Sequence, residues 1–243
     1  MNIVITGATS GIGEQVARDY ILAGHRVYVC GRNQDKLAAL TALELKPQQV
    51  TALAFDVSDV KACEQHLGPL RDIDLVILSA GVCEYIDDAQ HYDPALVQRV
   101  FAANFFGMVN CAAALLPQMR ANTTIAFIDS MSRLLPFTRA QAYGASKAAT
   151  YYFAQSLGVD LHPKGIRVVT VSPGFVKTPM TDANDFAMPM RITVEQASAS
   201  LRKQLEKGKQ TIYFPRLFGW ILRVMHKLPT AVQLAIARRM KDS

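Results

Sequence analysis

The 243-residue sequence predicts an α/β fold, in which a single domain is built on a doubly wound parallel sheet and is followed by a helical tail. Three observations predict it. Short β-rich segments alternate with longer segments of helical periodicity, a glycine-rich turn follows the first β-rich segment, and no repeat, low-complexity tract or Gly/Ser linker divides the chain. Such alternation produces βαβ units, whose parallel strands are covered by helices on both faces.

Seven β-rich segments are expected to form the sheet. The first four fit a mononucleotide-binding half and the later three fit a second half, which is a Rossmann-like arrangement. The predicted strands are residues 3–6, 26–30, 50–55, 75–79, 124–129, 166–172 and 210–214. Ligands are therefore expected at the carboxyl ends of these strands.

Helices are expected between the strands. Residues 14–23 follow the glycine-rich turn, and Pro94 opens a long helix that reaches residue 120. Another helix, residues 143–162, ends before Pro163 and Gly165.

The composition indicates a well-packed globular protein, because half of the residues are hydrophobic and only 19% are charged. The four cysteines have neither CxxC nor zinc-ligand spacing, which predicts reduced thiols, no metal site and a cytoplasmic location. We expect no secretory signal and no spanning helix, since no run approaches about 18 consecutive apolar residues. A nucleic-acid-binding motif is also absent from the sequence.

The glycine-rich turn at residues 6–13 (TGATSGIG) is the first candidate site. Glycine lets the backbone approach a pyrophosphate closely, and the N-terminus of the following helix offers unpaired N–H donors. The spacing is Gly-x3-Gly-x-Gly and not the general G-x-G-x-x-G fingerprint. A purely structural turn is the alternative.

The residue that follows the second strand predicts the type of cofactor. An acid at this position accepts hydrogen bonds from a ribose 2′-hydroxyl, whereas a cation pairs with a 2′-phosphate. No acid is present, and Arg32 offers a planar fork suited to phosphate, which predicts NADPH. The alternative is a solvated arginine that opens a helix. Asp56, after the third strand, is either an adenine contact or the cap of a helix beginning near Ser58.

Tyr143 and Lys147 have i,i+4 spacing and would share one helix face. An adjacent ammonium favours the phenolate and is expected to bring the tyrosine pKa down toward the working range. Ser130 stands thirteen residues before Tyr143, at a strand end, with Ser132 as a competitor and simple capping as an alternative role. Asn104 is a poor helix former within the long helix, and a structural amide is its alternative role.

In their order, these segments resemble the motifs of the short-chain dehydrogenase/reductase family, and the similarity extends to about residue 180. The resemblance implies that Tyr143 is the general acid/base and that Ser130 orients the carbonyl group. It also implies that Lys147 binds the cofactor ribose and that Asn104 holds a water in a proton relay. Ser79 replaces the usual asparagine of an Asn-Ala-Gly segment, which puts local stability in question.

The resemblance further implies a set of NADP(H) contacts spread over five loops and one helix. Those contacts are Gly7, Thr9, Ser10, Gly11, Ile12, Gly13, Arg32, Asp56, Val57, Ala80, Gly81, Tyr143, Lys147, Pro173, Gly174, Val176 and Thr178.

The expected function is that of an NADPH-preferring oxidoreductase, which transfers a hydride between nicotinamide and a carbonyl compound or secondary alcohol. A noncatalytic dinucleotide-binding regulator or scaffold is the main alternative, and an epimerase or dehydratase acting on nucleotide sugars is a third. Met180, Phe186, Met188 and Met190 would suit an apolar pocket for a lipophilic substrate, although ordinary packing explains them equally well.

Residues 215–243 are predicted to extend a 1–214 domain as two helices. They hold six Lys/Arg and one acid, so that this segment carries +5 of the net charge of +6. Arg216, Arg223 and Lys227 fall on one side of the first helix, as in an interfacial amphipathic helix. Packing on the body or on another subunit, association with a membrane surface and an acidic partner all stay open. The resemblance also predicts a homo-oligomer that pairs through residues 94–120 and 143–162.

Overall fold

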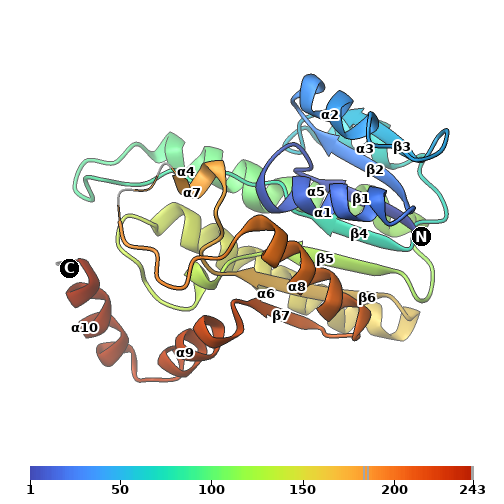
Figure 1. Ribbon diagram of the computed structural model, residues 1–243. Coiled ribbons are helices and arrows are strands. Elements are labelled where there is room, and N and C mark those ends of the chain that lie inside the picture. The colour runs from blue at the N-terminus through green and yellow to red at the C-terminus, as the bar shows by residue number, and fades with distance from the viewer. Residues whose placement is uncertain (183, 185, 242–243) are drawn as a thin grey trace.

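A seven-stranded parallel sheet forms the middle layer of the protein in a computed structural model that describes residues 1–182, 184 and 186–241 (Figure 1). The strand order is β3-β2-β1-β4-β5-β6-β7. The strands are β1 (Asn2–Thr6), β2 (Arg26–Gly31), β3 (Val50–Ala54), β4 (Leu75–Leu78), β5 (Thr124–Ile128), β6 (Arg167–Pro173) and β7 (Thr211–Phe214). All seven predicted strands are confirmed, and each predicted end agrees with the structure to within one residue.

The order of the strands reverses at β1, which pairs with β2 on one side and with β4 on the other. Thr6, the last residue of β1, lies opposite Cys30 of β2 and Leu78 of β4. The loops after these three strands therefore leave the sheet at the same edge. This topological switch point is where doubly wound folds bind their ligands.

Helices cover both faces of the sheet, and each face has its own buried core. One face packs against the buried apolar side chains of α1 (Gly11–Leu22), α2 (Gln34–Thr41) and α8 (Val194–Glu206). The other packs against those of α3 (Val60–Leu67), α5 (Gly107–Leu115) and α6 (Gln141–Leu161). Strands covered on both sides read as continuous apolar runs, and all four residues of β4 (LVIL) are buried accordingly. The α1 helix begins at Gly11, three residues before the predicted start.

The helix expected over residues 94–120 is interrupted. It consists of α4 (Pro94–Phe101), a π-helical turn (Ala102–Phe106), α5 and a 3₁₀ turn (Leu116–Gln118). A π-turn inserts one extra residue into a helix and commonly marks a functional position. Residues 94–118 are also long enough for a membrane span and contain an 18-residue window of mean hydropathy 1.6, yet 44% of that window is buried within the fold. Its α5 part contributes Met108, Cys111 and Leu115 to the buried core of this layer.

Short elements and the tail complete the fold. A 3₁₀ turn (Met131–Arg133) follows β5, another (His162–Lys164) follows α6, and α7 (Pro179–Asp182) follows β6. The tail folds as α9 (Arg216–His226) and α10 (Thr230–Lys241).

The two tail helices differ in how they pack. Phe218 and Leu222 of α9 are buried in a small cluster with Met131 and Leu134, and His226 Nδ1 lies 2.7 Å from the carbonyl oxygen of Leu134. No side chain that the structure describes in α10 is buried, and this helix extends away from the sheet (Figure 1). The tail is therefore joined to the body mainly through α9.

Candidate active site

The glycine-rich turn is packed so closely that side chains would not fit. A Cβ atom on Gly7, whose φ is +65°, would lie 2.7 Å from the Cα of Ala80, and one on Gly13 would lie 2.4 Å from the Gly7 carbonyl oxygen. Ser10 is the N-cap of α1, but its side chain makes no capping hydrogen bond. The first-turn N–H groups of α1 have no partner within the helix, so this cradle fits the phosphates of a dinucleotide.

Thr6 joins the ends of β1 and β4. Its buried hydroxyl oxygen accepts hydrogen bonds from the backbone N–H groups of Ser79, at 3.1 Å, and Ala80, at 3.4 Å. Ser79 stands where the resemblance would place an asparagine. Thr6 holds this turn through the backbone, which needs no amide side chain at position 79.

Arg32 and Asp56 lie together at the ends of β2 and β3. Arg32 Nη1 donates to Asp56 Oδ2 at 3.2 Å, while Asp56 Oδ1 accepts from the backbone N–H and the hydroxyl of Ser58. Desolvation acts to raise the pKa of Asp56, but the bonds from Ser58 and the charge of Arg32 outweigh it and lower that pKa. A cation and an acid thus face the adenosine side of the predicted site.

The alternative role of Asp56 as a helix cap is wrong. The α3 helix begins at Val60, and its N-cap is Asp59, whose carboxylate accepts from the N–H of Ala62 at 3.1 Å. Asp56 instead closes a local turn onto Ser58. Arg32 does not open a helix either, because α2 starts at Gln34 and is capped by Asn33.

The structure brings Ser130, Tyr143 and Lys147 together beside the carboxyl end of β5. Ser130 follows β5 and caps the next 3₁₀ turn, accepting from the N–H of Ser132, and its hydroxyl is also close enough to Tyr143 to lower the pKa of that phenol. Lys147 Nζ lies 5.7 Å from the centre of the Tyr143 ring. The competing Ser132 hydroxyl is buried and has no hydrogen-bond partner among the described residues.

Burial dominates the titration of this group. Desolvation lowers the pKa of Lys147 to about 8, although the nearby Asp129 carboxylate acts in the opposite direction. Lys147 Nζ also donates to the carbonyl oxygen of Ile128 at 3.0 Å. The pKa of Tyr143 is raised, mainly by desolvation and then by the charge of Cys83. The expectation of a lowered tyrosine pKa is therefore wrong for the chain alone, because burial of the phenol raises the pKa and the hydrogen bond with Ser130 opposes it only in part.

Asn104 is fully buried in the π-helical turn. Its Oδ1 accepts from the N–H of Val82 at 2.7 Å, and its Nδ2 donates to the Val82 carbonyl oxygen at 2.9 Å and to Ser146 Oγ at 3.0 Å. A Cβ on Gly81 would lie 3.0 Å from Asn104 Oδ1 and 3.4 Å from Lys147 Nζ. The amide side chain thus makes structural bonds at the edge of the site, and the water-holding role of Asn104 stays a prediction.

The loop after β6 connects the phosphate turn with the tail. A Cβ on Gly11 would lie 3.0 Å from Thr178 Cγ2, and a Cβ on Gly174 would lie 2.7 Å from Cδ1 of Phe218 in α9. Val176, between these two contacts, forms a bridge with Ile192. The predicted cofactor contacts in the glycine-rich turn and in the loop after β6 are therefore close neighbours in space.

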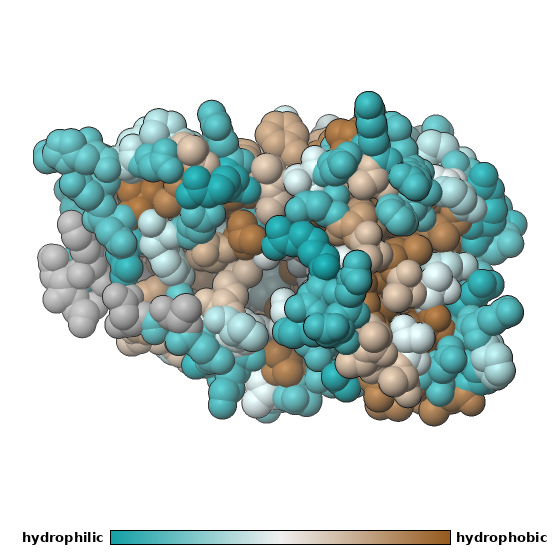
Figure 2. Space-filling view, turned by 90° about the horizontal axis from the view of Figure 1, so that it is seen from above, coloured by the Kyte–Doolittle hydropathy of each residue, from teal (hydrophilic) through white to brown (hydrophobic). Residues whose placement is uncertain are grey.

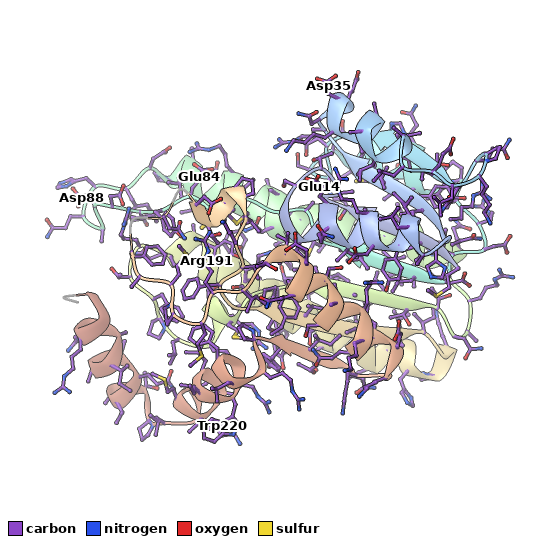
Figure 3. All side chains as sticks on the ribbon, viewed as in Figure 1. Glu14, Asp35, Glu84, Asp88, Arg191 and Trp220 are labelled. Atoms are coloured by element: carbon purple, nitrogen blue, oxygen red, sulfur yellow. The ribbon has the colours of Figure 1, made fainter. Side chains whose placement is uncertain are left out.

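The segment predicted to form the substrate pocket carries aromatic rings. Phe186 makes an edge contact with Tyr85, with ring centres 5.9 Å apart, and a second contact with Phe175 at 6.1 Å. Arg191 binds the Thr181 hydroxyl at 3.0 Å and the Asp182 carboxylate, bracing this segment (Figure 3). Positions 183 and 185 lie outside the described residues. Seen from above, the molecule is hollowed near its centre, with both apolar and hydrophilic residues at the rim (Figure 2).

A buried ion pair next to Ser130 was not predicted from the sequence. Asp129 Oδ1 binds Arg133 Nε at 3.2 Å and also accepts from the Ser172 hydroxyl, while the Arg133 guanidinium lies over the Tyr151 ring at 3.3 Å. Arg133 further donates to the Tyr213 hydroxyl at 2.9 Å. Burial raises the pKa of Asp129 to about 6 despite the charge of Arg133. The available signal was an acid next to the candidate serine with an arginine four residues later.

The profile of the family described as short chain dehydrogenase matches residues 1–187, which is most of the chain. The chain belongs to the short-chain dehydrogenase/reductase family. It is 30% identical to a protein of Myxococcus xanthus named uncharacterized oxidoreductase, over 98% of this chain and 96% of that protein. It is 34% identical to a serine 3-dehydrogenase of Agrobacterium fabrum, over 74% of this chain and 73% of the relative.

A solved structure of serine dehydrogenase in its closed form, complexed with NADP+, is similar in shape. The TM-score is 0.79 at 27% identity, with 88% of this chain and 94% of that one covered. Members of the family are oxidoreductases that use a nicotinamide cofactor and act on small molecules, and many are oligomers. This short-chain dehydrogenase/reductase is accordingly an enzyme, and the noncatalytic scaffold is the less favoured interpretation.

We predict that Arg133→Leu lowers the free energy of unfolding by about 3 kcal/mol, because it leaves the Asp129 carboxylate buried without its counter-charge. Arg18→Leu is the matched control. Both arginines pair at 3.2 Å with an acid four residues earlier, but the exposed fractions are 7% and 0% in the Arg133 pair and 37% and 29% in the Arg18 pair. The control should cost less than about 1 kcal/mol. Urea unfolding of both variants is the measurement, and equal losses would contradict the prediction.

Proposed function

We propose that this enzyme reduces the carbonyl group of a small molecule at the expense of NADPH, with Tyr143 supplying the proton. The observation that carries the proposal is the convergence of Tyr143, Lys147 and Ser130 beside a phosphate cradle in which no side chain would fit. When bound, the nicotinamide cofactor supplies the hydride. A regulator would need the cradle alone, and the buried catalytic side chains favour an enzyme.

Tyr143 holds the proton that reduction consumes. Because its pKa lies above the usual tyrosine value, the phenol is protonated throughout the physiological range. Oxidation of an alcohol would require the opposite state, with the proton already lost. Ser130 lies next to the phenol and would donate a hydrogen bond to the same substrate oxygen as charge develops on it.

Lys147 provides the positive charge of the site. A pKa of about 8 leaves it mostly cationic at neutral pH, with its ammonium beside the Tyr143 ring. There it would favour loss of the phenolic proton to the substrate oxygen and contact the ribose of the bound cofactor. Asn104 acts as a positioning residue in this scheme, since it ties Ser146 of α6 to the loop after β4.

Arg32 supports the preference for NADPH. It follows β2 directly, at the position where an acid would bind a ribose 2′-hydroxyl, and its guanidinium is largely exposed. The hydrogen bond to Asp56 orients one edge of the Arg32 guanidinium toward the end of β3. The serine dehydrogenase structure that this chain resembles was solved with NADP+, which supports the same preference.

The aromatic substrate side favours a lipophilic carbonyl compound. Phe186 contacts both Tyr85 and Phe175 there, and Met180 and Met190 are partly exposed nearby in the chain. A homo-oligomer is part of the proposal, because Tyr152 and Val159 of α6 expose apolar surface on the helix expected to pair.

We expect Tyr143→Phe to lower kcat by roughly 10²- to 10⁴-fold, because the variant cannot protonate the substrate oxygen. Tyr152→Phe, nine residues later on the same helix and highly exposed, is the control and should keep wild-type turnover. NADPH oxidation would be followed with a panel of aldehydes, ketones and quinones. Near-normal turnover in folded Tyr143→Phe would refute the assignment.

The rate of reduction should fall as the pH rises above about 8. Lys147 is cationic below its pKa of about 8 and neutral above it. The measurement is kcat/KM as a function of pH, because this profile reports the pKa values of groups in the free enzyme. Asp129→Asn removes a negative charge that raises the pKa of Lys147, so the fall should begin at lower pH. Asp72→Asn, at an exposed ion pair, should leave the profile unchanged. An unshifted profile in folded Asp129→Asn would be inconsistent with this electrostatic coupling.

Arg32→Leu should reduce kcat/KM with NADPH by roughly 10- to 100-fold and leave the value with NADH nearly unchanged, because a charge-assisted bond to the 2′-phosphate is lost. Arg26→Leu, at the other end of β2, serves as the control. Initial rates with both cofactors are the measurement. A wild type equally efficient with NADH, or an equal loss with both cofactors, would overturn the preference.

A further inference from the structure

The α9 helix has two apolar sides, of which the protein covers one. Phe218 and Leu222 are buried against the body. Leu217, Trp220 and Val224 recur at i, i+3 and i+7 on another side of the helix and are 60%, 62% and 45% exposed. Figure 3 shows Trp220 on the side of α9 that faces away from the sheet. A helix that only packs on a globular body needs one apolar side, so this second side requires a different explanation.

Basic residues flank the exposed apolar side. Between residues 207 and 241 the sequence contains eight Lys/Arg and no acid. Arg216 and Lys227 are exposed close to Trp220 on the helical wheel, and neither forms an ion pair with any residue that the structure describes. An occupant of this surface must therefore offer apolar contact at its centre and negative charge around it.

We propose that α9 docks on an anionic lipid surface, with Leu217, Trp220 and Val224 entering the headgroup region and Arg216 and Lys227 contacting lipid phosphates. Apolar burial combined with attraction of basic side chains to anionic lipids is how interfacial helices bind, and tryptophan is enriched at that depth. A second copy of this chain fits less well, because it would bring two surfaces of the same positive charge into contact. The docking does not depend on the proposed reaction.

The α10 helix continues the same chemistry. Val232 and Leu234 are 42% and 40% exposed, and Arg238 and Arg239 are exposed in its last turns. Gln233 Nε2 donates to the carbonyl oxygens of His226 and Leu228, which joins the start of α10 to the end of α9. Both helices of the tail therefore present apolar and basic groups together.

The contacts of α9 would hold the active site close to the lipid. Phe218 packs against Gly174 and lies 5.7 Å from Phe175, ring centre to ring centre, in the loop after β6. His226 reaches the Leu134 carbonyl oxygen, four residues beyond Ser130. The docked helix and the substrate side of the site thus share the same supporting cluster.

Trp220 is the only tryptophan of the chain, so its fluorescence reports directly on this surface. The full-length protein would be titrated with vesicles of phosphatidylcholine alone and with vesicles that also contain phosphatidylserine, and co-sedimentation would be measured in parallel. We expect a blue shift and binding with the anionic vesicles, both weakened by added salt. Absence of binding to anionic vesicles would overturn the proposal, as would equal binding to neutral ones.

Leu217→Glu and Val224→Glu keep the Trp220 probe. Each should weaken partitioning about tenfold or more, because a charge replaces an apolar group that would be buried in the lipid headgroup region. Val60→Glu is the matched control, since Val60 is an exposed valine at the start of α3, away from the tail. Unchanged binding of both tail variants would overturn the proposal. A blue shift that grows with protein concentration in the absence of lipid would overturn it in favour of a second copy.

Discussion

The buried side-chain amide of Asn104 connects the parts on which the active site depends. Its oxygen and nitrogen both bond to the backbone of Val82, after β4, while its nitrogen also reaches Ser146 of α6, and its backbone oxygen accepts from Thr150. A buried amide with satisfied bonds is costly to break, because any group left unpaired loses its solvation. The π-helical turn places this amide inward, and the side of α6 that carries Lys147 is positioned as a result.

Burial is the largest cause of the pKa shifts of the charged groups next to this amide. Lys147 and Asp129 are both nearly inaccessible, and their pKa values move toward neutrality, from above and from below. Asp129 supports the cation of Lys147, and its partner Arg133 lies in the 3₁₀ turn that Ser130 caps. Structural and catalytic roles are thus mixed within a few residues, which is why a substitution at Asp129 affects electrostatics and stability together.

The sequence predicted the sheet well, because parallel strands buried on both faces leave continuous apolar runs such as residues 75–78. Tyr143 and Lys147 were predicted from their i,i+4 spacing together with the family resemblance, and Ser130 from that resemblance. Two other features could not be predicted in this way. Asp59 and not Asp56 caps α3, and the side chain of Asn104 bonds to a loop 22 residues earlier. The direction of the tyrosine pKa shift could not be obtained from an i,i+4 neighbour, because its largest cause is burial of the phenol, which the spacing does not show.

The packing of the tail could not be predicted from the sequence either. A helical wheel of α9 shows apolar residues over most of its circumference, and only the structure shows that Phe218 and Leu222 face the body while Trp220 does not. Because Gly174 has no Cβ, Phe218 can pack directly on the loop that continues to Thr178 and the phosphate turn. A surface that fixes α9 would therefore also restrain this loop, and substrate would enter a site held beside that surface.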